Sequence, residues 1–125
     1  MTLATVDRVA FDAWLAGYFA AWASNDPLEV ERLFAPDAVY HYGPFGEPAR
    51  GRPQIVANWI ADGVPAEVEF RYDVLAVDDD VGVANWWVRQ RQRPGDDELE
   101  MDGILVIRFD AGGKCVEHRE WFHRR

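Results

Sequence analysis

Cysteine is almost absent from this sequence, because Cys115 is the only one in 125 residues. A single cysteine excludes a disulfide scaffold, and the three histidines (His41, His118 and His123) stand at no Cys/His spacing that binds zinc. We therefore expect neither a metal nor a metal cofactor. One free thiol fits a reducing compartment such as the cytoplasm.

Positive charge is also scarce: 13 Lys and Arg stand against 22 Asp and Glu, which gives a formal net charge of -9. Nucleic acid is not an expected partner, because phosphate binding requires a basic surface. The most apolar early stretch, residues 11–23, contains Asp12, lacks a basic leader and is too short to span a membrane. We expect a soluble cytoplasmic protein without a membrane partner.

Aromatic residues, by contrast, are abundant: they make up 14% of the chain and include six tryptophans. The length fits a single domain, residues 1–125, and the apolar fraction of 49% is enough for one core. The aromatic rings either fill that core or form the wall of a cavity, and composition does not separate the two uses.

The first half of the chain predicts three helices. Apolar residues recur every three or four positions over 6–24, which is typical of a helix with one buried face. Asp26 is a suitable N-cap for a second, short helix over 27–34. A third helix begins at Pro53 and ends at Asp62.

Strand patterns dominate the second half. A short strand is predicted over 38–42, before the third helix. Alternating apolar and polar residues predict a strand over 68–74, and turn-forming residues separate three more, over 81–93, 99–109 and 115–123. Helices followed by an antiparallel meander indicate an α+β domain.

A tight turn at Gly112-Gly113 predicts the register of the last hairpin. On one face it pairs Ile107 with His118, Leu105 with Glu120, and Gly103 with Phe122. The other face also carries large apolar groups, namely Ile104, Val106 and Trp121. Helices can cover only one of the two faces, so we expect a second copy of the chain to cover the other in a homodimer.

Three parts of the sequence resemble the nuclear-transport-factor-two-like superfamily. They are the segment Leu33-Phe34-Ala35-Pro36-Asp37-Ala38-Val39-Tyr40, the Gly/Pro-rich stretch 46–51 and the ending 108–118. Its SnoaL-like polyketide cyclase and ketosteroid isomerase branches are the most similar. The resemblance implies a conical half-barrel, in which a strongly curved, mostly antiparallel sheet wraps around the long first helix. It also implies a pocket beside the third helix, in a cystatin-like α+β roll with three helices.

The isomerase branch implies roles for three positions. Tyr18 corresponds to its oxyanion tyrosine, Tyr42 to its general base and Leu105 to its second oxyanion acid. Tyr18 either stabilises an enolate oxygen or is a core residue with a satisfied hydroxyl. A phenol is a poor base at neutral pH and leucine donates nothing, so we do not expect steroid isomerisation by that mechanism.

The polyketide cyclase branch is similar through a histidine followed two residues later by a carboxylate, here His118 and Glu120. The two side chains share the face that we assign to the pocket. Burial raises the pKa of a glutamate towards about 6 to 7, the range that a general acid or base needs. The alternative is that Glu120 pairs with an arginine and His118 is a satisfied wall residue.

The strand over 81–93 contributes three more candidates. Alternation groups Asn85, Trp87 and Arg89 on one face, and the resemblance places that face inside. Trp87 is then a pocket wall, while Asn85 and Arg89 orient a carbonyl or carboxylate. An Arg89 within reach of Glu120 lowers the pKa of that carboxyl and favours an ion pair.

The predicted binding residues are completed by Trp14, Tyr42, Trp59, Leu105 and Phe122. Our first hypothesis is a cofactor-independent enzyme for a small, largely apolar carbonyl compound, an isomerase, cyclase or lyase. In it Glu120 moves a proton, His118 assists, and Tyr18 helps to stabilise the negative charge. The second hypothesis is a binding or sensing module with the same pocket and no turnover.

Overall fold

Helix α1 (Arg8–Ser24) begins and ends at residues that replace missing backbone hydrogen bonds. The Asp7 carboxylate accepts a hydrogen bond from the Ala10 amide at 2.7 Å. Asn25 adopts the left-handed conformation, with φ of 57°, that ends the helix. The predicted bounds of this helix are therefore correct except for the first two residues.

The computed structural model describes residues 6–125. The other elements follow in the predicted order with two differences: the strand Ala49–Arg50 was not predicted, and the first strand begins at Phe34, where the second helix was predicted to end. These elements are α2 (Pro27–Glu31), β1 (Phe34–His41), β2 (Ala49–Arg50), α3 (Arg52–Ile60), β3 (Glu67–Asp78), β4 (Val81–Arg91), β5 (Leu99–Phe109) and β6 (Cys115–Arg124).

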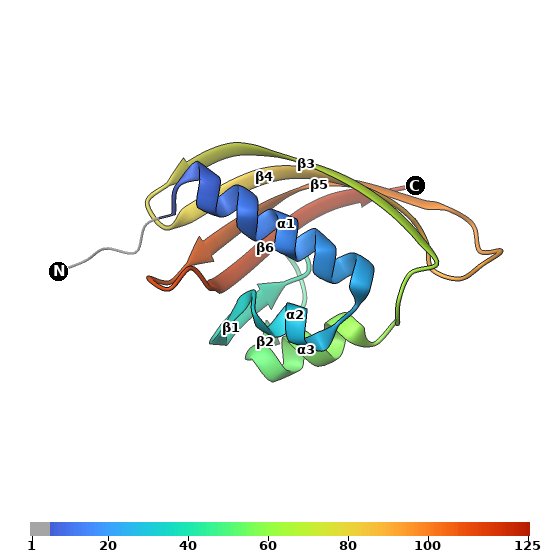
Figure 1. The fold of residues 1–125 in the computed structure, drawn as a ribbon, viewed down its shortest axis with the longest axis horizontal. Coiled ribbons are helices and arrows are strands. Elements are labelled where there is room, and N and C mark those ends of the chain that lie inside the picture. The colour runs from blue at the N-terminus through green and yellow to red at the C-terminus, as the bar shows by residue number, and fades with distance from the viewer. Residues whose placement is uncertain (1–5) are drawn as a thin grey trace.

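The strands form one six-stranded sheet in the order β2-β1-β6-β5-β4-β3. Strands β3 to β6 form an antiparallel meander, whereas β1 pairs with β6 in parallel and with β2 antiparallel. The sheet is strongly curved and not closed, and α1 lies across the face of its long strands (Figure 1). Within residues 6–125, the predicted α+β fold with three helices and a mostly antiparallel sheet is confirmed.

The predicted register of the last hairpin is correct along most of its length. Leu105 pairs with Glu120, and Ile107 with His118. The register shifts by one residue next to the turn, after Arg108. His118 and Glu120 therefore point to the concave side of the sheet, where both are buried.

Gly103 lies at a point on β5 where there is no room for a side chain. A Cβ atom at Gly103 would lie 2.6 Å from the Cβ of Phe122, closer than non-bonded carbon atoms approach. The residue that pairs with Gly103 on the next strand is Trp86, whose indole is 2% exposed and packs on the Phe122 ring at 5.6 Å. The missing side chain leaves room for this packing on the concave face.

The convex face of the sheet carries the apolar residues for which a second copy of the chain is predicted. Trp121 is 43% exposed, and Ile104 and Val106 are half-buried. The homodimer stays a prediction. Of the helices in residues 6–125, none combines the length and apolar character of a membrane-spanning segment.

Candidate functional site

A cavity of about 190 Å³ opens beside α3, between α1 and the end of β4. The residues that line it are mostly aromatic or amide-bearing: Tyr18, Trp22, Asn25, Tyr40, Tyr42, Trp59, Asp62, Gly63, Pro65, Gln90 and Gln92. Three residues singled out from the sequence, Tyr18, Tyr42 and Trp59, thus meet in one wall. Each comes from a different element or from the loop after β1, so only the folded chain brings them together.

Tyr18, Tyr40 and His118 form a hydrogen-bonded chain at the buried end of this cavity. The Tyr18 hydroxyl lies 2.9 Å from the Tyr40 hydroxyl and 3.1 Å from Nε2 of His118. The Tyr40 ring also stacks on the His118 imidazole, with ring centres 3.7 Å apart and planes 9° apart. These contacts fix both hydroxyl groups in position.

His118 is fully buried, and this determines its charge. Burial lowers the pKa of its imidazole to about 3, so the ring is neutral at physiological pH. Its Nδ1 atom has no hydrogen-bond partner among the described residues. His118 can therefore relay or orient a hydrogen bond, but it does not act as a cationic acid.

Glu120 lies two residues further along β6 and is 7% exposed. Burial raises the pKa of its carboxyl to about 8, and the nearby Tyr40 hydroxyl, which favours the charged form, offsets the rise only in part. Within residues 6–125, no cation lies within ion-pair distance of this carboxyl. The alternative in which Glu120 pairs with an arginine is therefore wrong.

The tyrosines of the wall remain protonated. Burial raises the pKa of Tyr18 and Tyr40 well above the ordinary value, and the charge of Glu120 raises both further. The same two causes, burial first, raise the pKa of Tyr42. Tyr42 is thus an even poorer base than a free phenol, whereas Tyr18 and Tyr40 can serve as hydrogen-bond donors.

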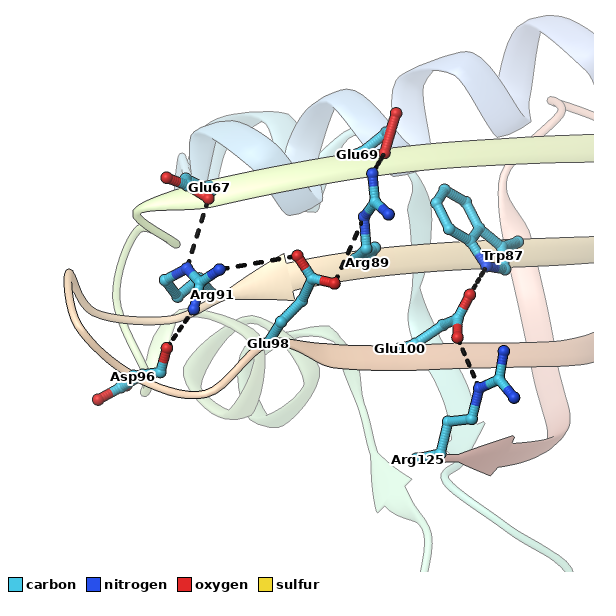
Figure 2. A network of polar contacts seen from close by, with 9 residues as sticks. All are labelled: Glu67, Glu69, Trp87, Arg89, Arg91, Asp96, Glu98, Glu100 and Arg125. Atoms are coloured by element: carbon cyan, nitrogen blue, oxygen red, sulfur yellow. Dashed lines mark hydrogen bonds and ion pairs between the residues drawn. The ribbon is translucent and has the colours of Figure 1, made fainter.

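The inward orientation predicted for Asn85, Trp87 and Arg89 is wrong. Arg89 pairs with Glu69 at 2.6 Å and with Glu98 at 3.7 Å on the convex face (Figure 2). The Trp87 indole donates a hydrogen bond to the Glu100 carboxylate at 2.7 Å in the same network (Figure 2). Asn85 donates to the Asp102 carboxylate at 3.0 Å. These groups neither line the cavity nor approach Glu120.

The register between β4 and β5 explains the error. Trp87 pairs with Asp102, on the convex side, whereas Trp86 pairs with Gly103, on the concave side. The bulky indole that points inward is the one that lies opposite a glycine. The inner face of β4 consists of Ala84, Trp86 and Val88, which are almost fully buried.

Three other predicted binding residues lie outside the cavity wall described within residues 6–125: Trp14 and Leu105 belong to the core, whereas Phe122 is 38% exposed. Trp14 is 8% exposed, and its indole nitrogen donates to the Leu33 carbonyl at 3.1 Å. Leu105 is fully buried. Phe122 faces inward but packs on Trp86. The wall instead includes Tyr40 and the amide of Gln90. Tyr40 alternates with Tyr42 in the predicted strand, so the sequence could have indicated that both face the cavity. No sequence pattern indicates Gln90.

Comparison with known proteins agrees with this arrangement. Residues 15–118 match the model of the SnoaL-like domain. The chain belongs to the SnoaL-like family. The matched range includes Tyr18, Tyr40 and His118 and ends before Glu120.

Two relatives illustrate the range of chemistry around this SnoaL-like protein. A steroid Delta-isomerase from Nocardioides simplex is 29% identical over 110 residues, which are 88% of this chain and 87% of that protein. The solved structure of SalBIII, an epoxide hydrolase/cyclase-like enzyme in pyran ring formation in the polyether salinomycin, has a TM-score of 0.78 at 16% identity. The match covers 94% of this chain and 93% of that one, and it supports the shared fold.

Proposed function

We propose that this SnoaL-like protein is a cofactor-independent enzyme that transfers a proton on a small, largely apolar carbonyl compound, with Glu120 as the acid/base group. The observation that carries the proposal is the state of Glu120: a buried carboxyl with a pKa of about 8 and no countercharge among the described residues. Such burial is costly to a fold, whereas an acid/base group needs a pKa near the working pH.

The proposed reaction consumes no other reactant. The Glu120 carboxylate takes a proton from the carbon beside the carbonyl group, which breaks the C–H bond and leaves an enolate. The protonated Glu120 then returns the proton to the same carbon or to another one, which restores the carboxylate. Returning it to another carbon gives an isomer.

The tyrosine chain supplies the oxyanion donor. In His118, a proton on Nδ1 would be an unpaired buried donor, whereas a proton on Nε2 can be donated to Tyr18. Tyr18 then donates to Tyr40, and the Tyr40 hydroxyl, which favours the charged form of Glu120 before the reaction, can turn to the enolate oxygen once Glu120 has taken the proton. Tyr40 lines the cavity, whereas Glu120 lies behind it and does not line the cavity, so the proposed transfer requires the ligand to reach past the Tyr40 hydroxyl.

Exchange of protons for deuterons tests this directly, because it needs no knowledge of the natural substrate. The wild-type protein is incubated in D₂O with small cyclic ketones such as 2-tetralone, and deuteration beside the carbonyl is followed by NMR. We expect exchange above the uncatalysed rate, rising with pH through a midpoint of about 8 as the Glu120 carboxyl ionises. A rate that falls through this range would assign Glu120 the role of general acid.

The substitution Glu120→Gln should reduce the exchange to background while the ketone still binds. The matched control is Glu117→Gln, which removes a carboxylate from the convex face of the same strand, where Glu117 pairs with Arg119 at 3.2 Å. Unchanged exchange in Glu120→Gln would remove this residue from the mechanism. Ketone binding without exchange in the wild-type protein would favour the binding module.

A further inference from the structure

The cavity has flat walls. The indole of Trp59 stands edge-on to Tyr18, with ring centres 5.1 Å apart and planes 84° apart, and at 86° to Tyr40. Trp22 and Tyr42 line the same space. Aromatic walls of this kind gain most from a planar ligand, because flat surfaces bury the largest apolar area against one another.

The cavity also lacks a partner for an anion. Among the lining residues that the structure describes, none is Arg, Lys or His, and the one charged side chain is Asp62. Glu120 adds a second carboxyl behind Tyr40. A carboxylate or phosphate on the ligand would lose its hydration and meet neutral and acidic groups but no cation, which is unfavourable.

The size of the cavity is a third constraint. Its volume of about 190 Å³ is slightly larger than the roughly 150 Å³ that holds one benzene ring, and below the roughly 300 Å³ at which pockets for drug-sized ligands begin. A ring system of one or two fused rings fits this space, with part of the second ring at the mouth. Four fused rings do not.

Hydrogen bonds between elements hold the mouth at this size. The Trp22 indole donates to the Gln90 amide oxygen at 2.8 Å, which links α1 to β4. The Gln92 amide donates to the Asp62 carbonyl at 2.7 Å and to the Gly63 carbonyl at 3.2 Å. A larger ligand would have to break these contacts.

We propose that the cavity takes an uncharged, planar molecule of one or two fused rings with one oxygen that accepts a hydrogen bond, and that it rejects both anionic compounds and four-ring steroids. The inference rests on the proposed function for the identity of the site and adds its substrate class. It also separates this protein from the isomerase that it resembles, whose name specifies a steroid.

Equilibrium binding tests this class, measured by quenching of tryptophan fluorescence and by calorimetry. The probes are 2-tetralone, a ring-carboxylated 2-tetralone and a four-ring ketosteroid. We expect 2-tetralone to bind at least tenfold more tightly than each of the other two. Equal or tighter binding of the carboxylate or the steroid would overturn the inference.

Two substitutions connect the selectivity to its causes. Asp62→Asn should improve binding of the carboxylated probe several-fold relative to 2-tetralone, whereas Asp97→Asn, at an exposed loop, should leave this ratio unchanged. Trp59→Leu should widen the slot and improve steroid binding relative to 2-tetralone. No change in either selectivity would show that these side chains do not set it.

The binding result and the proposed catalysis can fail separately. Measurements on Glu120→Gln report binding in a protein that cannot transfer the proton. If 2-tetralone binds selectively but does not exchange in the wild-type protein, the substrate class stands and the proposed proton transfer fails. If exchange occurs but the steroid or carboxylate binds equally well, the proton transfer stands and the substrate class fails.

Discussion

Leu105 and Glu120 face each other across β5 and β6, and both point to the concave side of the sheet. The resemblance to the isomerase branch assigns a second acid to the position of Leu105. Here the buried carboxyl is on the neighbouring strand, directly opposite that position. The acidic group of this chain therefore lies in the same region of the fold, but on β6 instead of β5.

The first prediction concerns stability and pH. The pKa of Glu120 is about 8 in the folded protein against 4.5 in the unfolded chain. Between these values the folded protein binds more protons than the unfolded chain, so the free energy of unfolding falls as pH rises from about 4.5 to 8. The contribution of Glu120 is fully present below pH 4.5, and the loss is on the order of a few kcal/mol.

Thermal unfolding at several pH values measures this loss. We expect Glu120→Gln to remove most of the decline in Tm between pH 5 and 8.5, because a neutral amide does not titrate. Glu117→Gln, on the exposed side of β6, should retain the wild-type decline. The same decline in wild-type and Glu120→Gln proteins would mean that the Glu120 carboxyl ionises at its ordinary pKa.

The second prediction concerns the Tyr40 hydroxyl. Tyr40→Phe should slow ketone exchange by about 100-fold, as expected when one oxyanion donor is lost, with little effect on ketone affinity. It should also move the midpoint of the pH–rate profile above 8, because the Tyr40 hydroxyl lowers the pKa of Glu120. A merely structural role would not move that midpoint.

The matched control for this substitution is Tyr72→Phe. Tyr72 lies on β3, where its ring stacks on Phe19 at 5.3 Å, away from the cavity lining. We expect its exchange rate and profile to be those of the wild-type protein. If Tyr40→Phe behaves like Tyr72→Phe, the oxyanion donor is another group.

The third prediction concerns the proton on His118. We expect ¹⁵N NMR to show a neutral ring protonated on Nε2, unchanged from pH 5 to 8, because burial holds its pKa at about 3. This tautomer directs the hydrogen-bond chain through Tyr18 to Tyr40. A proton on Nδ1 would leave Nε2 as an acceptor, so the chain would run from Tyr40 through Tyr18 to His118 and Tyr40 would not be the oxyanion donor.

Sequence periodicity predicted the elements of this fold well because each depends on local chemistry. Helix α1 follows from the spacing of residues such as Trp14 and Tyr18, although the predicted buried face also contained Val9, which is 79% exposed; the last hairpin follows from its turn. The same parity placed His118 and Glu120 on one face before any contact was known. The local sequence pattern was sufficient to predict which side chains share a face wherever that depended on a single helix or hairpin.

The faces of β4 show where that reasoning ends. Alternation divides this strand into two sets, one with Trp86 and one with Trp87, and each set contains one indole. The indole that lies inside is that of Trp86, which pairs with Gly103 on the adjacent strand. The side of the sheet to which Arg89 points therefore depended on the register between β4 and β5, which the sequence of the Pro94–Asp97 turn did not specify. The predicted pairing of Arg89 with Glu120 depended on the same register.

The last prediction concerns the convex face, where we expect a twofold homodimer. Its apolar centre consists of Val83, Ile104, Val106 and Trp121. Polar groups surround this centre: Arg89 pairs with Glu69 towards one end of the sheet (Figure 2), and Arg119 pairs with Glu117 beside Val106. Burial of such a patch stabilises association by about 25 cal/mol for each Å² of apolar surface removed from water, before the entropic cost of association.

Sedimentation velocity with Trp121→Asp tests the dimer, because a carboxylate at the centre of the patch would be buried in both copies without a partner. We expect the wild-type protein to sediment as a dimer and Trp121→Asp as a monomer that keeps the Tyr18–His118 chain and ketone exchange. Val9→Asp is the control, since Val9 is 79% exposed on α1, at a distance from the convex face. A wild-type monomer at micromolar concentration, or a Trp121→Asp dimer, would contradict the prediction. In that case the half-buried Ile104 and Val106 would be ordinary surface residues of a monomeric enzyme.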